Sequence, residues 1–271
     1  MTAALTIAAA LVVGYVAVAA VLWHFQERIV FQPSRAMDAA AADGLSRLSI
    51  EARDGTALFA LVVGQRGAGS PPILAFHGNA VVARWLIPWA REAARRFNTC
   101  VILAEYRGYD HLAGRPTYLG SQLDADAAFA VACRHVSAAP SEFVLYGHSL
   151  GTAVATELAS RQTVRSLVLE SPFTSARDMV ARWPIVGLRA GWSLISRVHF
   201  DTASLVRNLG VPVHVAHGER DLVIPVRMGR EVFAAAKIKG GLLILPTADH
   251  NNVAQVGGEE YWKWVGNGLG L

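Results

Sequence analysis

Ser149 is the side chain in this sequence whose surroundings first suggest chemistry. It is the third residue of Gly-His-Ser-Leu-Gly (147–151), which follows an apolar run. Glycines at a strand-to-helix turn let the two elements pack closely, so one interpretation is a structural serine. The other is a strained elbow that holds a serine hydroxyl out toward a substrate. A pattern this short arises by chance in roughly one such sequence in nine, so other residues have to decide.

An imidazole and a carboxylate that could activate Ser149 follow later in the chain. A serine hydroxyl is a weak nucleophile until a base takes its proton, and histidine suits that task near neutral pH. His250 comes after the last apolar run, and Asp221 lies in the polar stretch His-Gly-Glu-Arg-Asp (217–221). A carboxylate would hold the imidazole in the right tautomer. Glu170 is the alternative acid, and a plain surface-loop role is the alternative for His250.

Short apolar runs are expected to form the strands that position these residues. The runs are 73–76, 100–106, 143–147, 166–170, 211–218 and 241–246. An earlier hairpin over 45–64 is expected to turn at Asp54-Gly55, and segments with helical spacing, such as 81–96 and 123–136, separate most of the runs. This alternation predicts an α/β fold, a mostly parallel sheet with helices on both faces. In such sheets ligands bind beyond the carboxyl ends of the strands.

Five motifs at the ends of these strands occur in an order that resembles the α/β-hydrolase family. They are Phe-His-Gly-Asn-Ala (76–80), Tyr-Arg-Gly-Tyr (106–109), Gly-His-Ser-Leu-Gly (147–151), Glu-Ser-Pro-Phe (170–173) and His-Gly-Glu-Arg-Asp-Leu-Val-Ile-Pro (217–225). The set is similar to that of the membrane-anchored α/β-hydrolase domain-containing subfamily. The similarity extends from about Arg28 to the C-terminus. It implies a serine hydrolase with the α/β-hydrolase fold.

The resemblance implies a catalytic triad of Ser149, Asp221 and His250, in the chain order that this fold uses. Such a triad needs neither a metal nor an organic cofactor, so none is expected. The sequence departs from the subfamily pattern at Asp110 and Asp249, because a glycine is usual at both positions.

The oxyanion hole of such an enzyme consists of two backbone N–H groups. One belongs to Leu150, the residue after the nucleophile. The resemblance places the other at Asn79, with Ala80 as the alternative.

The composition of the 271-residue chain favours one α/β domain with an additional membrane segment. Hydrophobic residues make up 53% of the chain and charged residues only 17%, an apolar bias that a core alone does not require. The net charge of +4 is spread out, and without a basic stripe or a recognisable module no nucleic-acid partner is expected. Cys100 and Cys133 form neither a disulfide framework nor a metal-binding spacing. We expect a monomer.

Residues 3–23 contain no charged side chain and are expected to form a transmembrane anchor helix. Such a helix would extend about 31 Å, the thickness of a bilayer's hydrocarbon core. A cleaved signal peptide is the alternative, but the segment lacks a basic start and is longer than an h-region. Arg28 and Arg35 after the span, with no Lys or Arg before it, favour a single-pass membrane protein whose hydrolase domain (28–271) faces the cytoplasm.

An insertion over about 172–210 is expected to form a short cap above the site. Its arginines and tryptophans are Arg177, Arg182, Arg189, Arg197, Arg207, Trp183 and Trp192. They could contact anionic head groups of the membrane, or they could simply pack on the core. The resemblance implies hydrolysis of acyl esters or thioesters, lipids of the membrane included. A serine peptidase on the same triad and a non-catalytic membrane-anchored binding module are the alternatives.

Overall fold

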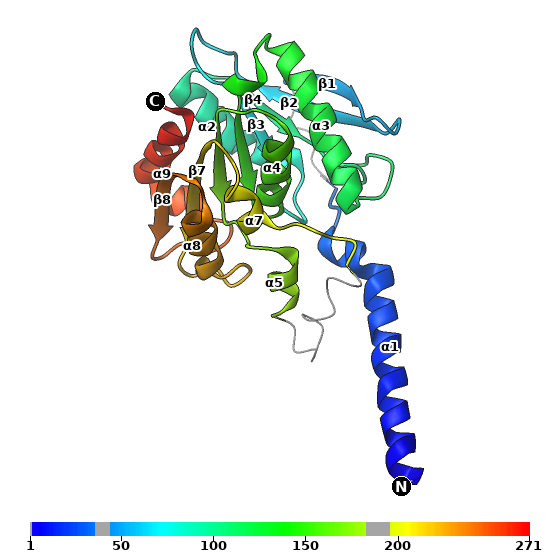
Figure 1. Ribbon diagram of the computed structural model, residues 1–271. Helices are drawn as coiled ribbons and strands as arrows, with labels where there is room; N and C mark the ends of the chain where they lie inside the picture. The colour runs from blue at the N-terminus through cyan, green and yellow to red at the C-terminus, as the bar shows by residue number, and fades with distance from the viewer. Residues whose placement is uncertain (1, 36–43, 183–195) are drawn as a thin grey trace.

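The computed structural model describes residues 2–35, 44–182 and 196–271 and shows a layered domain with one long N-terminal helix (Figure 1). Trp183, Arg189 and Trp192 of the predicted cap lie outside these residues. The strands are β1 (Ser46–Glu51), β2 (Ala57–Val63), β3 (Ile73–Phe76), β4 (Val101–Ala104), β5 (Val144–His148), β6 (Ser166–Glu170), β7 (Pro212–Gly218) and β8 (Ile238–Leu245). The α-helices are α1 (Thr2–Val30), α2 (Ile87–Phe97), α3 (Tyr118–His135), α4 (Leu150–Arg161), α5 (Ala176–Val180), α7 (Thr202–Val206), α8 (Val226–Ala235) and α9 (Val253–Leu269). The 3₁₀ turns are η2 (Ala83–Leu86) and η3 (Pro140–Glu142).

The described strands form one eight-stranded sheet in the order β1-β2-β4-β3-β5-β6-β7-β8. Strand β2 pairs antiparallel with β1 and β4, and the other neighbouring pairs are parallel. The strand order reverses between β3 and β5, because β4 lies on one side of β3 and β6 on the far side of β5. Such a switch point opens a crevice at the carboxyl ends of its two strands. Asn79 follows β3 and Ser149 follows β5, so both lie at this crevice.

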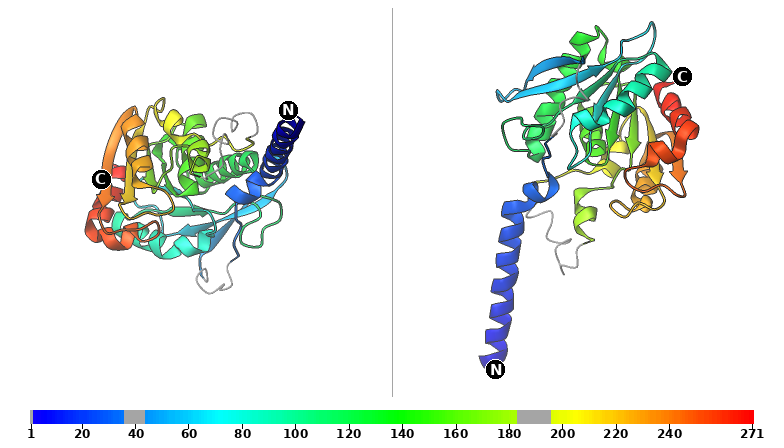
Figure 2. Two further views of the ribbon diagram at one scale, coloured as in Figure 1. Left: turned by 90° about the horizontal axis from the view of Figure 1, so that it is seen from below. Right: turned by 180° about the vertical axis from the view of Figure 1, so that it is seen from behind.

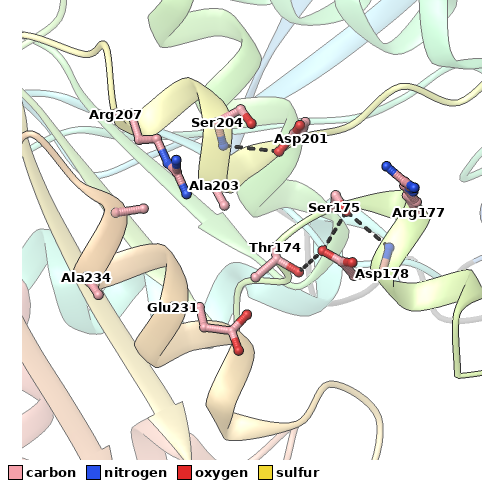
Figure 3. A pocket seen from close by; sticks show the side chains of 11 residues that line it. Thr174, Ser175, Arg177, Asp178, Asp201, Ala203, Ser204, Arg207, Glu231 and Ala234 are labelled. Atoms are coloured by element: carbon pink, nitrogen blue, oxygen red, sulfur yellow. Dashed lines mark hydrogen bonds between the residues drawn. The ribbon is translucent and has the colours of Figure 1, made fainter. Parts of the chain in front are cut away.

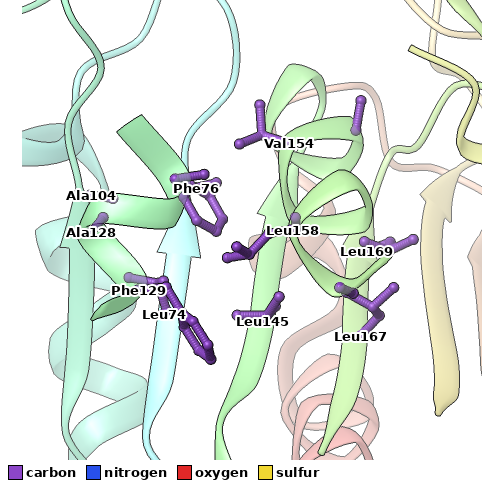
Figure 4. Packing of buried hydrophobic residues seen from close by; sticks show 14 of the residues in the cluster. Leu74, Phe76, Ala104, Ala128, Phe129, Leu145, Val154, Leu158, Leu167 and Leu169 are labelled. Atoms are coloured by element: carbon purple, nitrogen blue, oxygen red, sulfur yellow. The ribbon is translucent and has the colours of Figure 1, made fainter. Parts of the chain in front are cut away.

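Helices cover both faces of the sheet, as Figure 2 shows from below and from behind. Helices α3, α4 and α8 pack on one face, and α2 and α9 on the other. Side chains alternate between the faces along each strand: Leu145 joins the first cluster, and its neighbours Val144 and Tyr146 join the second. Figure 4 shows Leu145 of β5 with Leu74 and Leu167 of the neighbouring strands β3 and β6 and with Leu158 of α4. The two-sided burial explains the continuous apolar strands, and the predicted fold class is confirmed.

Helix α1 extends away from the domain at the end where α5 lies (Figure 1). It continues past residue 23 to Val30, and its segment Leu5–Val30 is long and apolar enough to cross a membrane, with a mean hydropathy of 2.5. Leu11 is 70% exposed, so much of the apolar surface of α1 is not covered by the domain. Among the described residues, the C-terminal turns of α1 contact the domain, and directly after α1 the buried Phe31 meets the Phe200 ring at a centroid distance of 6.2 Å.

Candidate active site

Ser149 occupies a sharp turn between β5 and α4. Its backbone angles are φ 53° and ψ −117°, a region that residues with a Cβ rarely occupy. Such a conformation costs about 1–3 kcal/mol and persists where the surrounding structure enforces it. Here the Ser149 N–H donates to the Glu170 carbonyl at 2.9 Å, and the Thr152 N–H donates to the Ser149 carbonyl at 3.0 Å. The strained turn is thus held from both sides.

The glycines around Ser149 let α4 approach the sheet more closely than other residues would. A Cβ on Gly147 would lie 2.4 Å from the carbonyl oxygen of Gly151, and a Cβ on Gly151 would lie 2.1 Å from that of Phe76. Both separations are far below van der Waals contact. The two interpretations of the Gly-His-Ser-Leu-Gly motif therefore do not compete, because close packing creates the turn that presents the serine.

The variant Gly151→Ala is expected to destabilise the fold, although alanine is the better helix former. Helix propensity alone would favour alanine by about 1 kcal/mol, but overpacking against the Phe76 carbonyl predicts a net loss of about 1–3 kcal/mol. Gly210→Ala is the control, because a Cβ there meets no atom within 4 Å. Urea unfolding should give a lower midpoint for Gly151→Ala than for Gly210→Ala. Equal midpoints would contradict the close approach of α4.

Ser149, His250 and Asp221 form a continuous chain of hydrogen bonds. Oγ of Ser149 lies 3.0 Å from Nε2 of His250, and Nδ1 of His250 lies 2.6 Å from Oδ2 of Asp221. Because a carboxylate only accepts hydrogen bonds, Nδ1 carries the proton and donates to Asp221. Nε2 is then free to accept the hydroxyl proton of Ser149. The structure thus brings together the three residues that the sequence predicts, in an arrangement that can move a proton from serine to histidine.

Both carboxylate oxygens of Asp221 accept hydrogen bonds. Oδ1 accepts from the N–H groups of Val223 (2.8 Å) and Ile224 (2.7 Å), and Oδ2 also lies 3.1 Å from Nε2 of His217. Burial alone would raise the pKa of Asp221, but the hydrogen bonds from His217 and His250 outweigh it and hold that pKa well below 3.8. A pKa that is lower in the folded state means that the carboxylate stabilises the fold at neutral pH. This contribution is lost only as the pH falls below 3.8 toward the folded-state pKa.

Glu170, the alternative acid, belongs to a different network. Its Oε2 accepts from the hydroxyls of Tyr146 (2.8 Å) and Tyr261 (2.5 Å), and the Tyr261 hydroxyl accepts from the Trp89 indole at 2.8 Å. Burial and the nearby Glu170 charge raise the pKa of both tyrosines well above 10, so both stay protonated and keep donating. Within the described residues, the carboxylate bonded to the His250 ring is that of Asp221.

Two further motif histidines fix the loops around the site. Nε2 of His77 lies 2.7 Å from Oε1 of the buried Glu105, whose Oε2 accepts from the Ala83 N–H at 2.9 Å. Nε2 of His148 donates to the backbone carbonyl of His250 at 3.1 Å. Burial lowers the pKa of His148, so its ring is neutral at pH 7. The ring packs beside that of His250, with the two ring centroids 5.2 Å apart. No sequence motif singles out Glu105, which reads as the end of an apolar strand.

Asn79 and Leu150 border the same cavity as Ser149. Leu150 is the first residue of α4, so its N–H has no carbonyl partner one turn earlier in the helix. Asn79 is positioned through its side chain, because its Oδ1 accepts from the Gln32 N–H (2.7 Å) and from the Tyr109 hydroxyl (2.9 Å). The two residues predicted to supply oxyanion donors therefore lie beside Ser149.

The cavity at Ser149 has a volume of about 220 Å³ and mostly apolar walls. The walls come from the end of α1, from α5, and from the loops that carry Phe173, Phe200 and Ile224. Ser149 and Asn79 are the polar residues at its border. A mostly apolar cavity with a few polar groups at one end is typical of a site that binds a small apolar ligand.

A larger cavity of about 760 Å³ lies between α5, α7 and α8, and polar side chains line it (Figure 3). Two of these side chains cap short helices: Oγ of Ser175 accepts from the Asp178 N–H (3.1 Å), and Oδ1 of Asp201 accepts from the Ser204 N–H (3.0 Å). Its described lining contains no member of the Ser149 hydrogen-bonded chain. The smaller, apolar cavity is therefore the candidate substrate site.

The two departures from the subfamily pattern have local explanations. Asp110 has a φ of 42°, a conformation that favours glycine, and its carboxylate lies 2.6 Å from Nε of Arg84. The Asp249 carboxylate accepts from the N–H of Asn251 (2.9 Å) and the side chain of Asn252 (2.8 Å). Asp249 thus shapes the loop that carries the imidazole.

Two cap arginines have partners inside the protein. Arg182 donates to the backbone carbonyls of Leu222 (3.3 Å) and Val223, in the loop that follows the acid. The Arg197 guanidinium lies 3.8 Å from the centroid of the Trp23 ring of α1. These contacts join the cap to the acid loop and to the N-terminal helix.

Ile29 and Val30 are site residues that the sequence pattern does not indicate. They line the cavity at Ser149, yet in the sequence they read as the end of an apolar N-terminal segment. The available signal is a second, short apolar stretch, Ile29-Val30-Phe31, which follows the charged Glu27-Arg28 and lies beyond the length that a bilayer needs. Among the residues that the structure describes, no group of three or more His, Cys, Asp or Glu side chains could hold a metal ion.

Sequence relatives connect the chain to named α/β-hydrolase proteins. No protein-family model matches the chain. It is 29% identical over 236 residues to an uncharacterized protein of Mycobacterium tuberculosis, covering 85% of this chain and 82% of that protein. It is 31% identical to protein bem46 of Schizosaccharomyces pombe, covering 66% and 61% of the two chains. It is 26% identical to the α/β hydrolase domain-containing protein 17B of Xenopus laevis, covering 68% and 62%.

Solved structures with the same fold include two esterases. The Pyrococcus furiosus esterase Pf2001 superposes with a TM-score of 0.69 at 19% identity, covering 89% of this chain and 97% of the esterase. The esterase RhEst1 from a Rhodococcus species superposes with a TM-score of 0.62 at 18% identity, covering 83% and 98%. With the strand order and these relatives taken together, the chain has the α/β-hydrolase fold and is similar in sequence to proteins named as α/β-hydrolase domain-containing proteins.

Proposed function

We propose that this protein is a membrane-tethered serine esterase that works through an acyl-enzyme intermediate on Ser149. The observation that carries the proposal is the hydrogen-bonded chain from Ser149 through His250 to Asp221, placed at the mouth of an apolar cavity. The esterase names among the solved structures with this fold agree with it.

In the first half of the reaction, Oγ of Ser149 attacks the acyl carbon while its proton moves to Nε2 of His250. The bond between the carbonyl carbon and its oxygen becomes single, and the oxygen carries the negative charge. In this proposal the N–H groups of Leu150 and Asn79 stabilise this charge, and one such donor is worth about 10²–10³ in rate. When the intermediate collapses, the bond to the leaving group breaks, and the leaving group takes the proton from His250. Asp221 stabilises the transient imidazolium.

In the second half, water replaces the leaving group. His250 takes a proton from the water, whose oxygen bonds to the acyl carbon and forms a second oxyanion intermediate. The bond to Ser149 Oγ then breaks, Oγ regains the proton from His250, and the carboxylic acid leaves. The original serine proton has left with the leaving group and a proton from water has replaced it, so Ser149 and His250 end the cycle in their starting protonation states.

We assign residues 3–23 to a membrane anchor and residues 28–271 to the hydrolase domain, with the cap over 172–210. The exposed apolar surface of α1 supports the anchor, because such a surface is stable in lipid but not in water. Arg28 and Arg35 on the C-terminal side support a cytoplasmic domain. In membranes from expressing cells, the protein should resist extraction by alkaline carbonate. Intact-protein mass spectrometry should show that the N-terminal residues are still present. Release of the protein from the membranes by carbonate, together with a mass that lacks residues 3–23, would indicate a cleaved signal peptide.

The proposed activity can be tested on the full chain in detergent micelles. A fluorophosphonate probe should modify Ser149, as located by mass spectrometry of the labelled peptide. The same preparation is assayed with p-nitrophenyl esters, the matching thioesters and peptide p-nitroanilides. Turnover of esters or thioesters well above that of the anilides supports the proposal, and the opposite order would establish a peptidase. If Ser149 were not labelled and no substrate were hydrolysed, the protein would instead be a non-catalytic binding module.

A further inference from the structure

The last turn of α1 forms part of the wall of the cavity at Ser149. Ile29 and Val30 line this cavity together with Leu150 and Phe200. We propose that Ile29 and Val30 set the length of the acyl chain that the enzyme accepts, so that the membrane anchor is also a specificity element. This inference rests on the proposed esterase function and assigns the acyl group to the apolar cavity.

The chemistry of the triad decides which side of the site holds the acyl group. After the attack the acyl carbon is bonded to Ser149, and its oxygen faces Leu150 and Asn79. All three residues border the apolar cavity of about 220 Å³. The leaving group takes its proton from His250, and His250 borders a different cavity of about 430 Å³, which also includes Asn251. The acyl chain therefore extends into the cavity that contains Ile29 and Val30.

The volume of the cavity indicates how much of an acyl chain its described walls can surround. A group the size of a water molecule takes about 30 Å³, so the roughly 220 Å³ enclosed by the described residues holds about seven such groups. A methylene group is of similar size. With the carbonyl carbon at Ser149 added to these seven groups, the cavity surrounds an acyl chain of about eight carbons.

Contacts on both sides of Ile29 and Val30 fix their position. Before them, Oε1 of the buried Gln26 accepts from the Arg197 N–H, and Oε1 of Glu27 accepts from the Tyr118 N–H at 3.2 Å. After them, Phe31 is buried in the core. The wall is thus part of the fold and not a loosely attached anchor.

The residues that directly follow α1 also contact the loop after β3, which carries the proposed oxyanion donor Asn79. The Gln32 N–H donates to Oδ1 of Asn79 at 2.7 Å. The same short segment therefore forms one wall of the cavity and orients one of the two residues that face the developing oxyanion. A change in this segment acts on the site directly, independent of the membrane.

The test compares the hydrolysis of esters with different acyl chain lengths in detergent micelles. No bilayer is present, so the distance between the active site and a membrane surface cannot affect the result. The ratio of kcat/KM for p-nitrophenyl octanoate to that for p-nitrophenyl acetate is measured for the wild type, Val30→Trp, Val30→Ala and Val21→Trp. Val21 is 55% exposed on the same helix, so Val21→Trp makes the same change in side-chain size away from the cavity. Each buried methylene contributes about 0.8 kcal/mol, a factor of about four.

We expect Val30→Trp to lower the octanoate-to-acetate ratio at least tenfold, Val30→Ala to raise the ratio for longer esters such as laurate, and Val21→Trp to keep the wild-type ratio. If Val30→Trp does not fold, the Val30→Ala profile decides alone. A wild-type chain-length profile in Val30→Ala and in any folded Val30→Trp would overturn the inference while the esterase function stands. A wild type that hydrolyses neither ester and leaves Ser149 unlabelled would instead overturn the proposed function.

Discussion

Replacing Ser149 by alanine is expected to lower kcat for ester hydrolysis by about five to six orders of magnitude. The variant removes the only atom of the triad that bonds to the substrate, while the oxyanion donors and the cavity remain. The residual rate should therefore still exceed the uncatalysed rate in water by about 10³–10⁴-fold, through binding and oxyanion stabilisation. The fold should tolerate the change, because alanine is no larger than serine.

The measurement is kcat with p-nitrophenyl butyrate, together with fluorophosphonate labelling of the same samples. Ser160→Ala is the matched control, since Ser160 lies near the far end of α4 and its hydroxyl donates only to the Glu157 carbonyl at 2.7 Å. The control should keep both turnover and label. If Ser149→Ala retained turnover within tenfold of the control, the nucleophile would lie elsewhere.

Replacing Asp221 by asparagine is expected to lower kcat by about 10⁴-fold through the wrong histidine tautomer. The N–H groups of Val223 and Ile224 both point at Oδ1, so the amide oxygen of asparagine will take that place. Its NH₂ group then replaces Oδ2 and donates to Nδ1 of His250. The proton of the imidazole must move to Nε2, which can no longer accept the proton of Ser149.

Glu170→Gln is the comparison that distinguishes the two candidate acids. Glutamine can still accept from the hydroxyls of Tyr146 and Tyr261, which donate to the Glu170 carboxylate in the structure, and the backbone bond from the Ser149 N–H to the Glu170 carbonyl is unaffected. We expect this variant to lose less than about tenfold in kcat, since its network is separate from the proton-transfer chain. A loss of several orders of magnitude in Glu170→Gln, with a mild effect of Asp221→Asn, would reverse the assignment.

The strands could be predicted from the sequence because both faces of the sheet are covered. The predicted runs 73–76 and 166–170 match the bounds of β3 and β6, and the apolar residues in each follow one another without alternation, as in Leu167-Val168-Leu169. Strand β8 begins at Ile238, earlier than its apolar run predicts. The pair Gly240-Gly241 reads as a break in the sequence, yet a Cβ at Gly240 would lie 2.4 Å from the His214 ring. The glycine makes room for a side chain of β7, which no local pattern reveals.

The candidate site could be predicted as far as local motifs define it. Ser149, Asp221 and His250 each follow a recognisable strand, and parallel strands bring their carboxyl ends to one edge. Glu105 and Val30 carry no such local signal, because their positions depend on packing between segments far apart in the chain. Helix α3 also begins at Tyr118, earlier than the expected 123, because the Thr117 side chain caps it by accepting from the Gly120 N–H at 2.9 Å.

The placement of Ile29, Val30 and Gln32 has a consequence for how this chain can change over evolution. If α1 is the proposed anchor, the exposed apolar residues nearer its N-terminus need only match the thickness of a bilayer, and another apolar segment of the same length can replace them. In the proposed enzyme the substrate also constrains positions 29–32, because Ile29 and Val30 line the cavity and Gln32 donates to Asn79. Exchanging the whole N-terminus for another targeting device, such as a fatty-acyl modification, would therefore alter which molecules are hydrolysed as well as where the protein resides.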